Sequence, residues 1–254
     1  MRNSISRRAV LGGLAATGTL LAGCGRLDGR TPFRQLLDLS DEFTLRAQRL
    51  ILPKHALVRE LPLSQLSARF PINGTSFPRG DSYQRLLDGE FRDWRLRVHG
   101  LVERPLALTL AELKSLPART QITMHNCDEG WSAVGQWTGV ALARLLALAG
   151  IKPEARYVVF HCLDKIDLDG NYYYESLDLF DALHPQTILA YGMNGRDLPV
   201  GHGAPLRLRV ETQIGYKNAK FVDRIELVDR LSSIGKGRGG WWEDFDRAVW
   251  YAGQ

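Results

Sequence analysis

Residues His125–Leu146 read HNCDEGWSAVGQWTGVALARLL, and this stretch decides the fold and places the main candidate functional residue. Just before it, Gln121–Met124 alternates polar and apolar side chains, which predicts a strand. Its second half carries apolar side chains at helical spacing, and Gly150 then suits the residue that follows a helix: Val140, Leu142, Leu145, Leu146 and Ala149. We therefore expect Cys127 in a loop that follows a strand, a few residues before a helix.

Cys127 has three chemical interpretations. It can be an inert buried thiol, which is the commonest fate of a free cysteine. It can be a nucleophile paired with a histidine, for which the sequence offers His125, His161 and His202. It can also bind a metal. A single thiolate without a CxxC partner does not suit structural zinc, which needs four protein ligands, but it suits a soft metal whose other ligands come from an organic cofactor.

Three blocks of sequence carry a resemblance to a known family. The first is CDEGWS at 127–132 followed by WTGV at 137–140. The second is YGMNG at 191–195 with HGAPLR at 202–207, and the third is GYKNAK at 215–220. In this order, over roughly residues 93–229, they resemble the sulfite-oxidase-like molybdopterin-dependent oxidoreductases. The resemblance implies an α+β fold of mixed sheets with short flanking helices, one molybdopterin per chain, and Cys127 as the catalytic molybdenum ligand.

The resemblance also implies a set of residues that contact the cofactor. They are Asn73, Ser76, Phe77, Cys162, His202, Arg207, Asn218, Ala219 and Lys220. The first three lie in a stretch rich in proline and glycine, residues 69–78, which is otherwise typical of a surface turn. Cys162 stands where the family often has a hydroxyl group, so a structural role for it stays open beside the functional one.

Two further segments admit both a structural and a functional interpretation. Residues 206–211 alternate as a strand, which puts Arg207 and Arg209 on one side. That side is either a solvated face or the place where Arg207 binds the pterin phosphate through paired donors. The glycine- and tryptophan-rich segment 235–246 either covers a substrate pocket or fastens the C-terminus to the core.

The first 23 residues predict an export signal. They contain three arginines, no acidic residue and an uncharged run from Ala9 to Gly23. Arg7-Arg8 resembles a twin-arginine signal, although Val10 replaces the usual phenylalanine. The apolar run is too short and too rich in small residues for a membrane helix. Leu21–Cys24 resembles a lipobox, so we expect an exported protein of the periplasm or cell envelope, either tethered to the membrane by lipid at Cys24 or soluble.

The rest of the chain is expected to form a lead-in and one domain. Residues 24–71 are assigned to a tether with a short amphipathic helix ending near Pro53, and residues 72–254 to the oxidoreductase domain. The full chain has a net charge of +5, and no basic run is interleaved with aromatics, which argues against nucleic acid as a partner. Three cysteines in 254 residues do not make a disulfide scaffold.

The residues after Cys127 indicate the substrate class. Sulfite oxidases follow their cysteine with an anion-binding sequence, whereas this chain has Asp128 and Glu129, which would repel sulfite. We therefore expect oxygen-atom transfer on a small sulfoxide or N-oxide. The chain has no CxxCH haem motif, so electrons are expected to come from a separate haem- or quinone-linked protein. The alternatives are a sulfite dehydrogenase of the same family, a cysteine-nucleophile hydrolase and a non-catalytic partner-binding lipoprotein.

Overall fold

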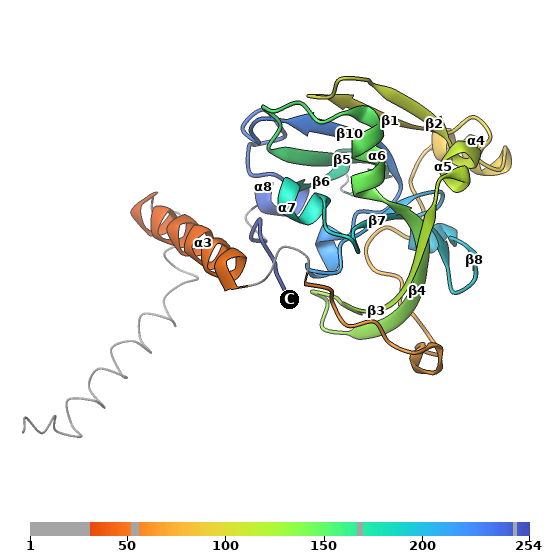
Figure 1. Cartoon of the computed structure of the whole chain (residues 1–254), viewed down its shortest axis with the longest axis horizontal. Helices are drawn as coiled ribbons and strands as arrows, with labels where there is room; N and C mark the ends of the chain where they lie inside the picture. Colours follow the sequence, from red (N-terminus) through yellow and green to blue (C-terminus); the bar gives the residue numbers. More distant parts are fainter. Residues whose placement is uncertain (1–30, 52–55, 167–169, 246–247) are drawn as a thin grey trace, which may run out of the picture. The chain divides into compact units, whose positions relative to one another are not determined.

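The computed structural model describes residues 31–51, 56–166, 170–245 and 248–254 (Figure 1). The chain divides into two compact units, Met1–Leu52 and Pro53–Gln254. In the first unit the structure describes one helix, α3 (Thr31–Ile51), which is much longer than the short helix expected from the sequence. Its length follows from composition, because Pro32 suits a first helical turn and no glycine or proline follows before Pro53. None of the described helices is both long and apolar enough to cross a membrane.

The second unit contains two five-stranded sheets. The first has the order β2-β1-β10-β5-β6, formed by Leu106–Thr109, Arg95–Gly100, Val222–Val228, Tyr157–Lys165 and Tyr172–Asp178. The second has the order β3-β4-β7-β8, with β9 also paired to β7; these strands are Ala118–Asn126, Ser132–Ala141, Ile188–Met193, Arg196–Asp197 and Arg207–Arg209. Strands β1 and β10 are parallel, and the other pairs are antiparallel. The α+β prediction is confirmed.

Short helices flank the sheets. The α-helices are α4 (Asp81–Asp88), α5 (Leu110–Ser115), α6 (Leu142–Ala149), α7 (Leu179–Ala182) and α8 (Trp241–Asp244). The described residues also form three 3-10 turns, η1 (Leu63–Gln65), η2 (Val200–His202) and η3 (Gly215–Lys217). Residues 56–71 belong to the second unit and pack on its second sheet, because the amides of Leu61 and Ser67 donate to the carbonyls of Ile122 and Val134. The boundary predicted at residue 72 stays a prediction.

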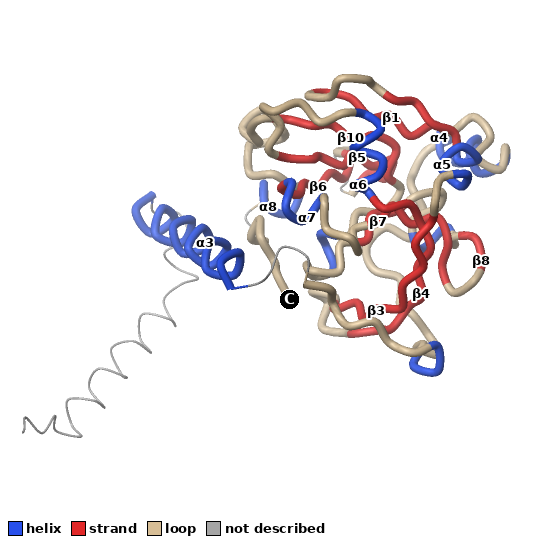
Figure 2. Tube along the Cα trace, in the orientation of Figure 1, coloured by secondary structure: helices blue, strands red, loops and turns tan. Residues whose placement is uncertain are grey.

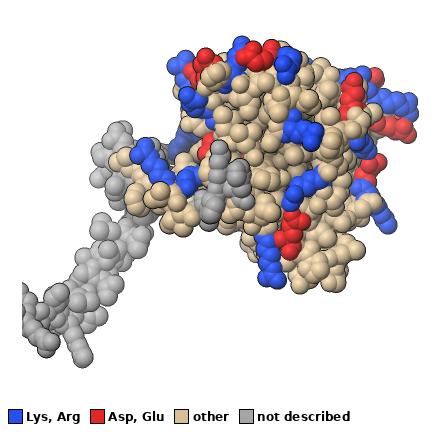
Figure 3. All heavy atoms as spheres, viewed as in Figure 1, with Lys and Arg blue, Asp and Glu red and all other residues tan. Residues whose placement is uncertain are grey.

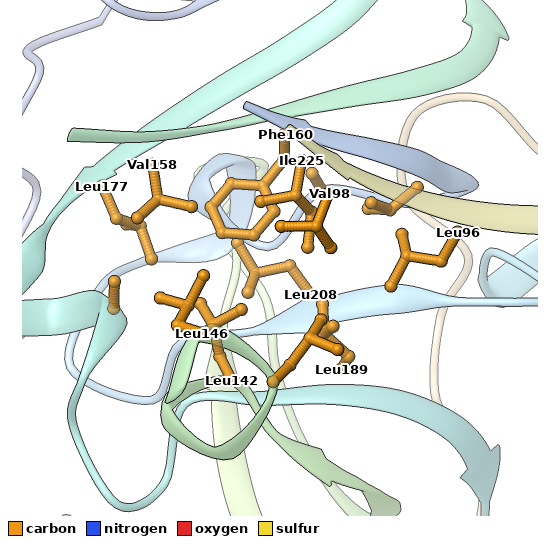
Figure 4. Close-up of a cluster of buried hydrophobic side chains, with 14 of the residues drawn as sticks. Leu96, Val98, Leu142, Leu146, Val158, Phe160, Leu177, Leu189, Leu208 and Ile225 are labelled. Atoms are coloured by element: carbon orange, nitrogen blue, oxygen red, sulfur yellow. The ribbon is translucent and has the colours of Figure 1, made fainter. Parts of the chain in front are cut away.

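The main core joins both sheets. Figure 4 shows side chains from the first sheet, among them Val98, Phe160 and Ile225, facing Leu189 and Leu208 of the second sheet. Helix α6 closes one side of this cluster through residues that include Leu142 and Leu146, both of which are fully buried. Burial of apolar side chains of this size contributes about 1.5–3 kcal/mol each, so the cluster fixes the two sheets against each other.

The segment around Cys127 forms a hairpin. Strands β3 and β4 pair along nine consecutive positions, from Ala118–Val140 to Asn126–Ser132, and Figure 2 shows them running side by side. The sequence predicted β3 and helix α6 but missed β4. Because β4 lies between Cys127 and α6, Cys127 is at the end of a hairpin rather than a few residues before a helix. Trp137, Thr138 and Val140 favour a strand. Gly139 is required there because a Cβ would collide with the carbonyl of Leu189 on β7.

Candidate functional site

The Cys127 loop is held in one conformation. The amide of Cys127 donates to the carbonyl of Trp131 over 2.9 Å, and the amide of Gly130 donates to the carbonyl of Cys127 over 3.1 Å. Gly130 has a φ of 88°, which favours glycine. The Cys127 residue is 9% exposed, and its Sγ lies 3.6 Å from Asp128 Oδ1. The hairpin therefore presents a nearly buried thiol at a fixed position.

A second loop packs directly on the Cys127 loop. We call residues 215–220 the clamp loop; it begins with the η3 turn. A Cβ added at Gly215 would lie 3.0 Å from Cys127 Cα and 3.1 Å from Asp128 Oδ1. Only glycine permits this close approach without displacement of the neighbouring loop. Two of the blocks recognised in the sequence, about 90 residues apart, therefore meet at the thiol.

An open cleft lies beside this junction. Its empty volume, including the part open to solvent, is about 480 Å³. Of the residues predicted to contact a cofactor, Asn73, Asn218, Ala219 and Lys220 line it. The other lining residues are Gly74, Thr75, Asp128, Glu129, Asp164, Ile166, Tyr173, Gly215, Tyr216 and Trp242. A pocket of this size with aromatic walls and a few convergent polar groups is typical of a small-molecule or cofactor site.

Lys220 holds the cleft together. Its Nζ donates to the carbonyl of Asn73 over 2.6 Å, to that of Gly201 over 3.0 Å, and to that of Thr75. The contacts tie the 73–75 loop and the η2 turn to the clamp loop. Burial, and secondly the charge of Arg207, lower the pKa of Lys220 to about 7. The cleft therefore has a desolvated cation that an anionic group would stabilise.

Arg207 and Arg209 are buried, so the interpretation of their side of β9 as a solvated face was wrong. Both guanidinium groups lie over the Trp137 ring, at 4.8 and 4.6 Å from its centroid. Arg209 is paired with Glu211 at 2.6 Å and bonded to His125 Nδ1 at 2.7 Å. The burial arises because Trp137 and His125 of the second sheet and the clamp loop cover this side, which the short strand alone could not reveal.

Arg207 uses its terminal nitrogens within the protein. They donate to the carbonyls of His202 at 3.1 Å and Asn218 at 3.2 Å, while the buried Nε has no partner. Burial, and then Arg209, lower the pKa of Arg207 to about 9. Arg207 therefore joins η2 to the clamp loop and adds positive charge near Lys220; its contact with a phosphate stays a prediction.

His202 faces away from the main cleft. Its ring lines a second hollow together with Phe70, Met193 and Arg196, and packs edge-on against Phe70 at 5.6 Å. Burial lowers its pKa to about 4, and its Nδ1 has no partner. The carbonyl of His202, rather than its ring, connects to the cleft through Arg207.

Besides His202 and Arg207, three further predicted contact residues do not line the cleft. Ser76 is exposed, and Phe77 packs against Tyr83 with ring centroids 5.3 Å apart. Cys162 is buried in the main core. Their cofactor contacts stay predictions. Gly74 and Thr75, which precede Ser76 in the same turn, line the cleft.

Asp164 is a candidate residue that the sequence interpretation missed. It follows Cys162 by two positions on β5, lines the cleft, and is 3% exposed. Its Oδ1 has no hydrogen-bond partner, and burial raises its pKa to about 6. The sequence did contain a signal for Asp164: it stands near the end of a buried strand, and period-two alternation puts its carboxylate on the same side of that strand as Cys162. The cleft thus combines an unsatisfied acceptor with buried cations.

The site fits a cofactor-bound metal better than a cysteine nucleophile. Burial raises the pKa of the Cys127 thiol to about 11, opposite to the shift that activates a nucleophile. Its Sγ donates to Asp128 Oδ1 over 3.6 Å rather than to a histidine. Within the described ranges no three histidine, cysteine or acidic side chains gather as a metal site. A metal held by Cys127 would therefore take its other ligands from a bound cofactor.

Comparison with known proteins identifies the family. Residues 84–234 match the model of the oxidoreductase molybdopterin binding domain. A protein of Azospira oryzae named "Putative protein-methionine-sulfoxide reductase subunit YedZ1" is 37% identical over 96% of this chain and 84% of its own length. The protein-methionine-sulfoxide reductase catalytic subunit MsrP of Xanthomonas campestris pv. campestris is 39% identical over 54% of this chain.

A solved structure was also found, that of the sulfane dehydrogenase SoxCD from Paracoccus pantotrophus. It aligns with a TM-score of 0.49 and 27% identity over 59% of this chain and 45% of that chain. The chain likewise spans only 46% of the MsrP sequence. The family match itself covers more than half of this chain and includes Cys127, Asp164 and the clamp loop. The protein belongs to the family of oxidoreductases with a molybdopterin-binding domain.

Proposed function

We propose that this protein is a molybdenum–molybdopterin enzyme that reduces sulfoxides by oxygen-atom transfer. The observation that carries the proposal is the junction of the Cys127 loop and the clamp loop at one cleft. The names of the relatives from Azospira oryzae and Xanthomonas campestris support the substrate class, because both refer to methionine sulfoxide. An N-oxide is the second substrate type that the same chemistry admits.

The chain's residues would hold one molybdopterin in the following way. Cys127 would supply one sulfur ligand to molybdenum, and Lys220 with Arg207 would offset the charge of the pterin phosphate. Asp164 would accept a hydrogen bond from an N–H group of the pterin through its unpartnered oxygen. Asn73 and the backbone of Asn218 and Ala219 would enclose the rings. When bound, the cofactor supplies two-electron redox and oxygen-atom exchange.

Asp128 and Glu129 favour a neutral substrate. Both line the cleft, so two carboxylates stand where a sulfite anion would have to approach. Their charge repels an anion, whereas a sulfoxide is neutral and accepts hydrogen bonds through its oxygen. Reduction of R2S=O consumes two electrons and two protons and yields R2S and water. The electrons would come from a separate haem- or quinone-linked protein.

The cellular location is part of the proposal. A twin-arginine signal exports folded proteins, which suits an enzyme that receives its cofactor in the cytoplasm. The signal and the lipobox cysteine Cys24 lie outside the described residues. We propose a periplasmic or cell-envelope enzyme with a lipid anchor at Cys24. Cys24→Ala in the full chain should move the enzyme from the membrane fraction to the soluble periplasmic fraction, and retention of the variant in membranes would oppose the anchor.

A turnover assay tests the proposed function. Enzyme made in a molybdenum-sufficient host is given a reduced viologen dye and a panel of sulfoxides and N-oxides, and sulfite with an oxidising dye. We expect sulfoxide-dependent dye oxidation, no activity in Cys127→Ser, and none in enzyme from a molybdenum-depleted host. A higher kcat/KM for sulfite oxidation than for any sulfoxide would instead establish the alternative, a sulfite dehydrogenase.

A further inference from the structure

A second hollow adjoins the cofactor cleft at the C-terminal end of the chain. We call it the C-terminal groove; it is lined by Asp128, Ile214, Tyr216, Trp242, Val249 and Ala252. Its empty volume, including the part open to solvent, is about 730 Å³. Asp128, Tyr216 and Trp242 also line the cofactor cleft, so the two spaces adjoin at these three residues. The groove therefore opens next to the residue that follows Cys127.

The groove has a mainly apolar wall with a single charge. Ile214, Val249 and Ala252 contribute hydrocarbon, and the two aromatic residues contribute ring surface. Asp128 is the charged member, at the end nearest the thiol. A neutral occupant with an alkyl part fits this lining. Burial of its methylene groups is favourable, and the occupant brings no charge that would be buried without a partner.

The wall is formed before any occupant binds. The amide of Ile214 donates to the carbonyl of Ala252 over 3.0 Å, and Tyr216 Oη donates to the carbonyl of Val249 over 2.5 Å. The amide of Gln254 donates to the carbonyl of Thr212 over 3.0 Å. These bonds hold the last residues of the chain, 249–254, against the segment 212–216, which leads into the clamp loop. A preformed wall loses little entropy on binding, which favours affinity.

We propose that the C-terminal groove binds the alkyl chain and adjoining backbone of a methionine sulfoxide residue. This inference rests on the proposed function and adds the part of the substrate that lies away from the sulfur–oxygen bond. The sulfoxide group would face the Cys127 side of Trp242, and the two side-chain methylenes would lie against Val249 and Ile214. Trp242, Val249 and Ala252 lie beyond the residues matched by the family model, so part of the groove is encoded outside that domain.

Substitution in the groove tests the proposal with the full-length, cofactor-loaded enzyme. Val249→Asp should raise the KM for N-acetyl-methionine sulfoxide amide about tenfold, the effect of burying two methylene groups. The KM for dimethyl sulfoxide, which lacks the chain, should change less than twofold, and kcat for both should stay within twofold. The matched control is Leu148→Asp on α6, since Leu148 is 44% exposed and Val249 is 42% exposed.

Each outcome decides the proposal. An equal change for both substrates, or no change for either, would overturn it. If the unmodified enzyme reduces no sulfoxide, the proposed function fails, and equilibrium dialysis with N-acetyl-methionine sulfoxide amide then decides the groove separately. If the unmodified enzyme and Leu148→Asp bind this compound and Val249→Asp does not, the groove is still supported as its binding site. If the unmodified enzyme does not bind it, the proposal is wrong. Molybdenum content and circular dichroism confirm that the variants are folded and loaded.

Discussion

Asp164 lowers the stability of the protein that lacks its cofactor. It is an almost fully buried carboxylate with one unpartnered oxygen, and burial raises its pKa to about 6. Because the folded-state pKa exceeds the ordinary value near 3.8, the folded protein binds a proton more readily than the unfolded chain. Stability contributed by the protonated form is therefore lost as the pH rises through the window from about 4 to 6.

Replacement of Asp164 by Asn should remove this pH dependence. Between pH 4.5 and pH 7.5 the free energy of unfolding of Asp164→Asn should rise relative to the unmodified protein by about 1–2 kcal/mol. Urea unfolding of cofactor-free protein at the two pH values measures the difference. An unchanged difference would mean that Asp164 is solvated in the folded protein. Molybdopterin content of the same variant should fall, because the asparagine amide does not replace the carboxylate.

For individual residues, the sequence predicted which ones lie at the site better than it predicted their contacts. It identified Cys127, Asn73, Asn218, Ala219 and Lys220, all of which meet at or beside the cleft. It could not show that Lys220 bonds to three carbonyls of other loops, since such contacts depend on tertiary packing. It also missed Asp164, because alternation along a strand gives the side but not the depth of a residue.

A buried charge cluster joins three elements around the cleft. Lys217 of η3 contacts Glu175 of β6 at 2.5 Å and Glu243 of α8 at 2.8 Å, and all three side chains are at most 1% exposed. A Cβ at Gly240 would displace both carboxylates from these positions. Burial raises the pKa of Glu175. The cluster positions α8, and with it Trp242, against the clamp loop.

Loss of the lysine should therefore be costly. Lys217→Met leaves two carboxylates buried without a cation and should lower the free energy of unfolding by about 3–5 kcal/mol. Lys114→Met is the matched control, because the Lys114–Asp197 pair is exposed and 2.6 Å long; its loss should lower stability by at most about 1 kcal/mol. Urea titration of both variants at pH 8 compares them. If both variants lose the same free energy of unfolding, the buried charge cluster contributes no more to stability than the exposed ion pair.

Helix α5 begins with a local side-chain interaction. Thr109 Oγ1 accepts from the amide of Glu112, and the Glu112 carboxylate accepts from the amide of Thr109. A threonine followed three residues later by a glutamate is the sequence signature of this capping box. Thr109→Ala should destabilise the protein by about 1 kcal/mol. Thermal or urea unfolding measures the loss, and Thr109→Ser should recover most of it. No recovery by serine would mean that the threonine methyl group, not the cap, is responsible.

At the scale of elements, local signals succeeded where a side chain interacts with its own helix or turn. The Thr109–Glu112 capping box and the Asn194–Gly195 turn between β7 and β8 are of this kind, since each has a short sequence signature. The sequence missed β4 and underestimated α3. Apolar residues in β4 continue into α6 without a break, so periodicity alone did not separate the strand from the helix.

The whole molecule has its described core within residues 83–252. All three hydrophobic clusters lie in the second unit, which begins at Pro53. On the face shown in Figure 3, positive and negative side chains are interspersed over this unit, in keeping with a modest net charge of +5. Stability is therefore expected to reside in the second unit.

Removal of residues 1–52 tests this expectation. The shortened chain should unfold within about 2 °C of the full chain, because a loss of 1 kcal/mol shifts the midpoint by only about 2–4 °C in a chain of this size. It should also acquire molybdenum in the cytoplasm. Calorimetry and metal analysis on both chains make the comparison. A midpoint lower by more than about 5 °C, or loss of the metal, would assign the first unit a part in folding.

The order of the three sequence blocks predicted the family, and the structure explains why order is informative. The Cys127 loop lies far along the chain from the Arg207 strand and the clamp loop, yet the three segments pack together beside one cleft. The substrate groove could not be predicted in the same way, since its wall combines the residues before the clamp loop with the last residues of the chain.

X-ray absorption at the molybdenum K-edge tests the central claim most directly. The account predicts that the metal in the unmodified enzyme has three sulfur neighbours, two from the cofactor and one from Cys127, and that Cys127→Ser has two. The serine variant should remain folded, because the loop is held by backbone hydrogen bonds that do not involve the sulfur. An equal number of sulfur neighbours in both proteins, or a folded enzyme without molybdenum, would contradict the account.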